Sequence, residues 1–179
     1  MPTQTVREPH LFTVAEYLQT NIPGRTELIE GVIYDVSPKN EPHVLAVSML
    51  ARALIRELGD EFLVRFQDPI AVSGWTGKND PEIDVAVVEN KPYRTRATEK
   101  DSFAFVEVSD TTYTDDRAEK IPLLVAGGVP TWHVNIPQRQ VEFYPKGANP
   151  KTPAQIFTDS EMVEILGVLI PVASLFAAR

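Results

Sequence analysis

The sequence predicts an α/β or α+β fold in which helices flank a mixed central β-sheet. Strand-like apolar runs outnumber helical segments along the 179 residues. A long amphipathic helix is expected before the most apolar of these runs, and another helix is expected between two later runs. Helices placed among strands in this way are typical of a sheet sandwiched between helical layers.

The helices are predicted from capping residues and from apolar residues at helical spacing. Thr13 can cap a short first helix, because Glu16 stands three residues later and completes a capping box. In the long second helix apolar residues recur every three or four positions, and Gly59 follows its end. Gly127 and Gly128 can supply the left-handed backbone that stops the third helix. Helices are therefore expected at 13–18, 42–58 and about 115–126, with a final helical turn after Pro171.

The strands are predicted from short apolar or alternating runs bounded by turn residues. Residues 27–36 form a strand or a tight hairpin pair in this prediction. The connection 136–139 contains Pro137 and is a hairpin signal between two strands. Further strands are expected at 62–72, 83–88, 103–108, 131–135, 140–144 and 162–166.

Length and composition predict one soluble globular domain over residues 1–179, with 43% hydrophobic and 23% charged residues. The absence of cysteine excludes disulfides and thiolate metal sites, and it fits a reducing cytoplasm. The N-terminus lacks the apolar core of a signal peptide, and no run approaches the length of a membrane span. We therefore expect a cytoplasmic protein without a membrane partner.

The net charge of −8 counts against a surface that binds nucleic acid everywhere, because phosphate neutralisation needs lysine and arginine. The connection 90–100 carries four basic residues and could follow a phosphate backbone locally. A charge run of this kind is more often a solvated loop.

Two carboxylates lie inside apolar strand-like runs. Asp84 is followed by four apolar residues, and Glu107 has apolar residues on both sides. A carboxylate in a buried run is costly unless it is paired, hydrogen-bonded or bound to a metal. Mg²⁺ prefers oxygen ligands and often takes one or two carboxylates together with water. The two acids therefore predict a site for Mg²⁺ or Mn²⁺ that serves a hydrolytic reaction.

Lys120 follows on the next predicted helix and is a cation that could reach this pair of acids. It could orient the attacking water or stabilise the charge that develops in the transition state. The alternative is an ordinary surface ion pair with Asp116, four residues earlier on the same helix.

A series of short motifs occurs in the order and at the spacing of one protein family. The motifs are 27–31, His43, 81–88, 106–110, 116–117, Lys120, 128–134 and 141–144. In this arrangement the chain resembles Uma2, also called DUF820, a family of predicted restriction-endonuclease domains in the PD-(D/E)XK nuclease superfamily. The resemblance runs from about residue 11 to about residue 175.

The resemblance implies a restriction-endonuclease-like core, Mg²⁺-dependent cleavage of nucleic-acid phosphodiester bonds, DNA as the substrate and, often, a homodimer. It places the two metal-binding acids of the superfamily on Asp84 and Glu107. Glu27 matches a further acid of the site, with Glu30 as the alternative, and Lys120 matches a catalytic lysine supplied by the following helix.

Two positions depart from the superfamily pattern. Ile83 stands where a proline precedes the first acid, and Pro81 lies two places earlier. Ser109 stands where a lysine follows the second acid. The second departure bears on the general base more than on the metal site.

Several residues keep a plainer interpretation beside the functional one. Glu27 and Glu30 would point to opposite faces of a strand, so only one of them is expected to reach the site. His43 lies in the first turn of the long helix, where capping and surface roles are common. His10 and His133 are interpreted as structural or solvated, and residues 109–112 as a polar strand-to-helix turn.

Three functions fit these observations. The first is a metal-dependent endonuclease with Asp84, Glu107, Glu27 and Lys120 in its site. The second is a catalytically inactive module of the same fold that binds nucleic acid or protein. The third is a metal-dependent hydrolase of a smaller phosphate ester.

Overall fold

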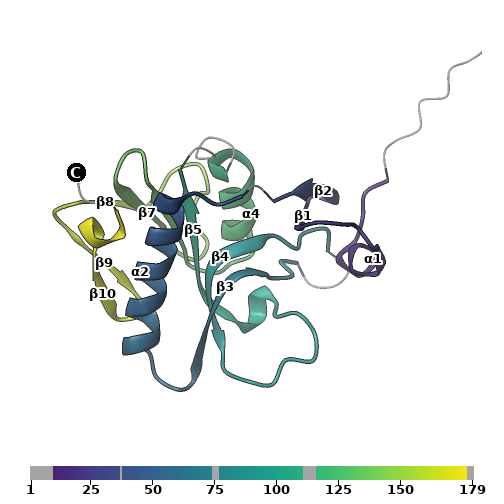
Figure 1. Ribbon diagram of the computed structural model, residues 1–179, viewed down its shortest axis with the longest axis horizontal. Helices are drawn as coiled ribbons and strands as arrows, with labels where there is room; N and C mark the ends of the chain where they lie inside the picture. The colour runs from purple at the N-terminus through teal and green to yellow at the C-terminus, as the bar shows by residue number, and fades with distance from the viewer. Residues whose placement is uncertain (1–9, 37, 74–76, 111–115, 177–179) are drawn as a thin grey trace, which may run out of the picture.

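Apolar side chains bury both faces of two central strands, β4 (Glu82–Glu89) and β5 (Ser102–Ser109). The computed structural model describes residues 10–36, 38–73, 77–110 and 116–176. Strands β4 and β5 lie inside a six-stranded sheet with the order β3-β4-β5-β6-β7-β8 (Figure 1). The other strands of this sheet are β3 (Phe62–Pro69), β6 (Thr131–Asn135), β7 (Gln140–Tyr144) and β8 (Gln155–Thr158).

Neighbouring strands of the central sheet are antiparallel, except that β5 and β6 are parallel. A parallel pair needs a crossover, and here the chain crosses through a π-helical turn, η2 (Asp116–Lys120), and helix α4 (Ile121–Ala126). This mixed sheet with flanking helices confirms the predicted fold class.

Helices cover the two faces of the sheet. Helix α2 (Glu41–Glu57) presents Leu50 and Leu54 to the face that carries Val85 and Val87. The opposite face packs against α4. Because successive residues of a strand point to opposite faces, the continuous apolar sequence of β4 supplies both layers of the core. No helix in the described ranges is long and apolar enough to cross a membrane.

A small hairpin, β1 (Thr26–Ile29) and β2 (Val32–Asp35), lies beside the start of β4, next to the short helix α1 (Val14–Gln19) (Figure 1). Leu28 and Asp80 exchange two backbone hydrogen bonds, of 2.8 and 3.3 Å, which tie the hairpin to the segment before β4. Glu30 occupies the hairpin turn with a φ of 50° and is exposed. Of the two candidate acids, it is therefore Glu27 that points towards the sheet.

Most predicted elements are confirmed, including the capping box of Thr13 and Glu16 and the hairpin of β6 and β7. Three predictions were wrong in detail. The strand expected to reach Val72 ends at Pro69 as β3, because a proline lacks the N–H that would continue the ladder. In addition, β8 was not expected, and the single strand expected near the C-terminus is a hairpin of β9 (Met162–Ile165) and β10 (Val168–Pro171).

The C-terminal region also contains the predicted helical turn, η3 (Val172–Leu175), and a second turn, η1 (Glu99–Asp101), precedes β5. Buried and exposed residues alternate in β9 and β10. Val163, Ile165, Val168 and Ile170 are buried, whereas the residues between them are exposed. The predicted loop at 73–80 and the turn at 109–112 fall partly outside the described residues.

Truncation of Leu54 is expected to destabilise the fold. Its side chain is fully buried between α2 and the sheet, so Leu54→Ala should lower the free energy of unfolding by about 2–5 kcal/mol. Ile55 follows it on α2 and is 59% exposed, so Ile55→Ala is the matched control, with an expected loss below about 1 kcal/mol. Urea unfolding of both variants measures the difference, and equal losses would contradict the described orientation of α2.

Asp80 is expected to make stability depend on pH. Burial raises the pKa of Asp80 from 3.8 to about 6, although Arg96 opposes this shift. The folded protein therefore binds a proton more tightly than the unfolded chain, and the contribution of Asp80 to stability should fall as pH rises from about 4 to about 6. Urea unfolding across this range should show the fall in wild type and a smaller one in Asp80→Asn. Identical profiles would rule out this contribution.

Candidate active site

The β4–β5 ladder ends where the two acids meet. Its last backbone pair on this side joins Val85 to Val106, and the same antiparallel register brings Asp84 beside Glu107. Beyond this point the N–H of Val108 donates a hydrogen bond of 2.9 Å to Oδ2 of Asp84 rather than to a backbone carbonyl. A side-chain carboxylate thus replaces a backbone carbonyl as the hydrogen-bond acceptor between the two strands, in the buried interior of the sheet.

Asp84 is fully buried, and Lys39 and His43 both lie close to its Oδ1 atom. Nζ of Lys39 lies 3.2 Å and Nε2 of His43 lies 3.0 Å from Oδ1 of Asp84. Burial alone would raise the pKa of Asp84, but the hydrogen bond with His43 and the charges of Lys39 and Lys120 outweigh it and lower the pKa to about 2. Asp84 is therefore ionised at neutral pH despite its burial.

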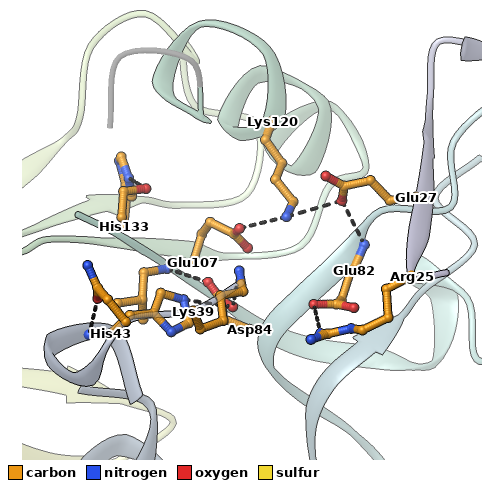
Figure 2. Close-up of polar contacts among 12 residues, drawn as sticks. Arg25, Glu27, Lys39, His43, Glu82, Asp84, Glu107, Lys120 and His133 are labelled. Carbon is orange, nitrogen blue, oxygen red and sulfur yellow. Dashed lines mark hydrogen bonds and ion pairs between the residues drawn. The ribbon is translucent and has the colours of Figure 1, made fainter. Parts of the chain in front are cut away.

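Lys120 joins the second acid to the N-terminal hairpin. Its Nζ lies 2.7 Å from Oε1 of Glu107 and 3.3 Å from Oε2 of Glu27, and its side chain is only 7% exposed (Figure 2). Burial lowers the pKa of Lys120, but the charges of Glu107, Glu27 and Asp84 outweigh burial and raise the pKa above its ordinary value. Lys120 is therefore a buried ammonium group between two carboxylates.

The local sequence explains why Lys120 points into the site. Lys120 is the last residue of the π-helical turn and precedes Ile121, which is fully buried, and Pro122 in the first turn of α4. Proline is favoured there because the first helical N–H groups have no intrahelical partner. The apolar face of α4 against the sheet thus fixes the direction of the lysine.

The structure brings together all four residues that the sequence singled out: Asp84, Glu107, Lys120 and Glu27. The side chain of Asp116 lies outside the described residues, so the alternative pairing of Lys120 with Asp116 keeps the status of a prediction. The two pairs of Lys120 with Glu107 and Glu27 are contacts across the fold, between η2, β5 and the hairpin.

Further polar contacts lead from Glu27 towards solvent. Oε2 of Glu27 accepts a hydrogen bond of 3.1 Å from the backbone N–H of Glu82. The side chain of Glu82 is buried and pairs with Arg25 at 2.6 Å, and Arg25 is half exposed (Figure 2). The polar contacts thus run from Lys120 through two successive acids, Glu27 and Glu82, to Arg25 near the surface.

Sequence reasoning missed Lys39, Arg25 and Glu82 and treated His43 mainly as a capping or surface residue. Only His43 carried a usable signal, because it stands on the same helical stripe as the buried residues Val47, Leu50 and Leu54. Its side chain is buried and faces Asp84, while its backbone N–H donates a hydrogen bond to Oδ1 of the N-cap residue Asn40. The surface interpretation of His43 was therefore wrong.

His133 belongs to a separate buried polar cluster on β5, β6 and β7. Its Nε2 lies 2.7 Å from the hydroxyl of Ser109, and its Nδ1 lies 3.6 Å from Oε2 of Glu142. Tyr144 donates a hydrogen bond of 2.5 Å to the same carboxylate. Of the two earlier interpretations of His133, structural or solvated, its complete burial supports the structural one.

Charges of the connection between β4 and β5 are partly satisfied within the protein. Lys91 pairs with Glu89 and Asp101 at 2.6 Å each, and Arg96 pairs with the buried Asp80 at 3.0 Å. These pairs support the interpretation of this connection as a structured, solvated loop.

The donor set of the site fits a hard divalent cation. No group of three or more histidine or acidic side chains in the described part of the chain is arranged to hold a metal ion. Asp84 and Glu107 nevertheless offer two ionised or lysine-paired carboxylates side by side, and Mg²⁺ commonly needs only one or two carboxylates because it keeps several waters.

Comparisons with known proteins identify the family and the fold. Residues 14–173 match the Uma2 family, which is described as "putative restriction endonuclease". The fold is similar to the crystal structure of a "putative nuclease belonging to DUF820" from Anabaena variabilis, with a TM-score of 0.68 and 14% identity. This similarity covers 92% of this chain and 97% of the other. The sequence matches none of the curated proteins with which it was compared.

Removal of the Lys120 charge is expected to destabilise the protein. Lys120→Met leaves the carboxylate of Glu107, which is 2% exposed, without its ammonium partner, so the free energy of unfolding should fall by about 3–5 kcal/mol. The double variant Lys120→Met/Glu107→Gln should recover part of this loss, because the uncompensated charge is gone. Urea unfolding at neutral pH measures both.

The matched control is Lys100→Met, because Lys100 is exposed on η1. Its expected effect is within about 0.5 kcal/mol. A loss in Lys120→Met no larger than in this control would contradict the described burial of the ion pair.

Proposed function

The chain belongs to the Uma2 family, and we propose on this basis that it is a metal-dependent endonuclease that hydrolyses phosphodiester bonds of DNA. The observation that carries the proposal is the meeting of Asp84 and Glu107 at the end of the β4–β5 ladder, with Lys120 2.7 Å from Glu107. Two buried carboxylates beside a lysine suit hydrolysis of a phosphate ester better than they suit a purely structural role.

Asp84 and Glu107 would hold the divalent cation, Mg²⁺ or Mn²⁺, in this proposal. Glu27 would assist from the hairpin side, since it already shares Lys120 with Glu107. When bound, the metal would polarise a phosphoryl oxygen and lower the pKa of a coordinated water. Asp84 needs no deprotonation before metal binding, because its pKa of about 2 keeps it ionised at neutral pH.

Lys120 would orient the attacking water and stabilise the negative charge that develops on the phosphate. Its ammonium group is held in place by two carboxylates, so it is oriented before the substrate arrives. Arg25, half exposed at the outer end of the polar contacts that lead from Glu27, would add positive charge on the side where a phosphate backbone approaches. We also propose that the protein acts as a homodimer, as the family resemblance implies.

Ser109 limits what β5 can contribute. It occupies the position two residues after Glu107 where the superfamily pattern has a lysine, and its hydroxyl lies 2.7 Å from His133. A hydroxyl carries no positive charge, so in this proposal Lys120 supplies the positive charge that this strand lacks.

A second candidate function is a non-cleaving module on the same fold that binds nucleic acid or protein. It is favoured by one observation, namely that Asp84, Glu107 and Glu27 already have cationic partners without any metal. In that case the acids would serve the stability of the fold alone.

The endonuclease proposal predicts nicking of a supercoiled plasmid when Mg²⁺ or Mn²⁺ is present and no nicking in EDTA. Asp84→Asn and Glu107→Gln should each reduce the rate by roughly 100-fold or more, which corresponds to a loss of about 3 kcal/mol of transition-state stabilisation. Glu164→Gln is the matched control, since Glu164 is an exposed acid on β9 and should leave the rate unchanged.

Titration calorimetry with Mn²⁺ separates the two functions. Metal binding without plasmid nicking would favour the non-cleaving module. Absence of Mn²⁺ binding at millimolar concentration would contradict the metal-dependent nuclease. Circular dichroism of each variant shows whether a lost activity reflects lost folding.

A further inference from the structure

Asp84 is already surrounded by donors before any metal is bound. Its Oδ1 faces Lys39 at 3.2 Å and His43 at 3.0 Å, and its Oδ2 accepts the N–H of Val108 at 2.9 Å. Both neighbours lie within ion-pair distance of Oδ1 and occupy the space beside it. A divalent cation that binds Asp84 through this oxygen must therefore displace one of them.

The two neighbours of Oδ1 differ in how easily they can leave. His43 lies on the buried stripe of α2, and its side chain is 6% exposed. Lys39 lies in the segment between β2 and α2, its side chain is 21% exposed, and Asp84 is its ion-pair partner. A lysine has a long flexible stem and a strongly hydrated ammonium group, so Lys39 can move into water more easily than the buried imidazole of His43. Lys39 is the neighbour that can move.

Charge balance points to the same residue. Asp84, Glu107 and Glu27 face two lysines, Lys39 and Lys120, within 2.7–3.3 Å (Figure 2). A divalent cation added among these groups would repel both ammonium groups, since little solvent screens charges in a buried site. Lys120 is 7% exposed and joined to two carboxylates, whereas Lys39 is joined to one. The lysine that leaves is therefore Lys39.

We propose that Lys39 is an exchangeable counter-ion: it neutralises Asp84 in the metal-free protein, leaves when a divalent cation binds, and then contacts a phosphate of the substrate. The inference rests on the proposed metal-dependent nuclease. It sets an order of events: the metal binds first, and Lys39 contacts the phosphate second. A released ammonium group at the rim of the site suits a phosphate, which it binds as a point charge.

Titration calorimetry with Mn²⁺ alone tests the exchange without any measurement of activity. Lys39→Met should bind Mn²⁺ about tenfold more tightly than wild type, because no ion pair has to be broken first. Lys39→Arg keeps the charge and should bind as weakly as wild type. Lys100→Met, on the exposed η1 turn, is the matched control and should also bind like wild type.

A purely structural role of Lys39 gives the opposite result. If the lysine only held Asp84 in position, its loss would weaken Mn²⁺ binding. Equal or weaker binding by Lys39→Met therefore overturns the inference while the metal-dependent function of wild type stands. If neither protein binds Mn²⁺, both this inference and the proposed function are wrong. If only Lys39→Met binds Mn²⁺, the inference is supported and the wild-type function is not.

Cleavage kinetics at saturating Mn²⁺ test the phosphate contact. Lys39→Met should raise KM for duplex DNA several-fold and leave kcat nearly unchanged, and Lys39→Arg should restore KM. An unchanged KM in Lys39→Met would overturn this second step. The split between KM and kcat distinguishes a phosphate contact from a general loss of structure, which would lower kcat as well.

Discussion

The buried ion pair between Lys120 and Glu107 is the interaction on which the candidate site depends. It connects the end of η2, directly before α4, to β5 in the sheet, and through Glu27 it reaches the N-terminal hairpin. A buried ion pair recovers its desolvation cost only when its geometry and remaining hydrogen bonds are good. The packing of α4 supplies that geometry, since Ile121 and Leu124 are fully buried and set the direction of Lys120.

The buried charges of the site lower the stability of the fold. Asp84 and Glu107 are 0% and 2% exposed. Apolar residues at these positions would avoid the free-energy cost of removing a carboxylate from water. The sheet tolerates the acids because its ladder opens at this point and because each acid has a cation within 3.2 Å. Asp84 and Glu107 lie side by side and each is held by a lysine, so the arrangement is compatible with the proposed divalent cation, for which the lysine of Asp84 would give way.

The two lysines of the site, Lys120 and Lys39, differ in burial and therefore in their proposed roles. Lys120, held by two carboxylates on a packed helix, remains beside Glu107 and belongs to the permanent electrostatics of the site. Lys39, held by one carboxylate on a connecting segment, is the group whose position can depend on metal. The distinction follows from where the chain places each residue, because the two side chains are chemically identical.

The sequence by itself determined which acids bear a cost, because an acid inside an apolar run such as 83–88 has to find a partner in any fold. It also determined most helices and strands, whose periodicity is local. Only the tertiary structure decided the partners: Lys39, His43 and Arg25 meet β4 from segments about 40 to 60 residues earlier, and no local pattern encodes such contacts. The same limit applies to β8, which is short and mostly exposed and is defined by its pairing with β7. Long-range packing therefore turned two costly acids into a site with a defined set of cations.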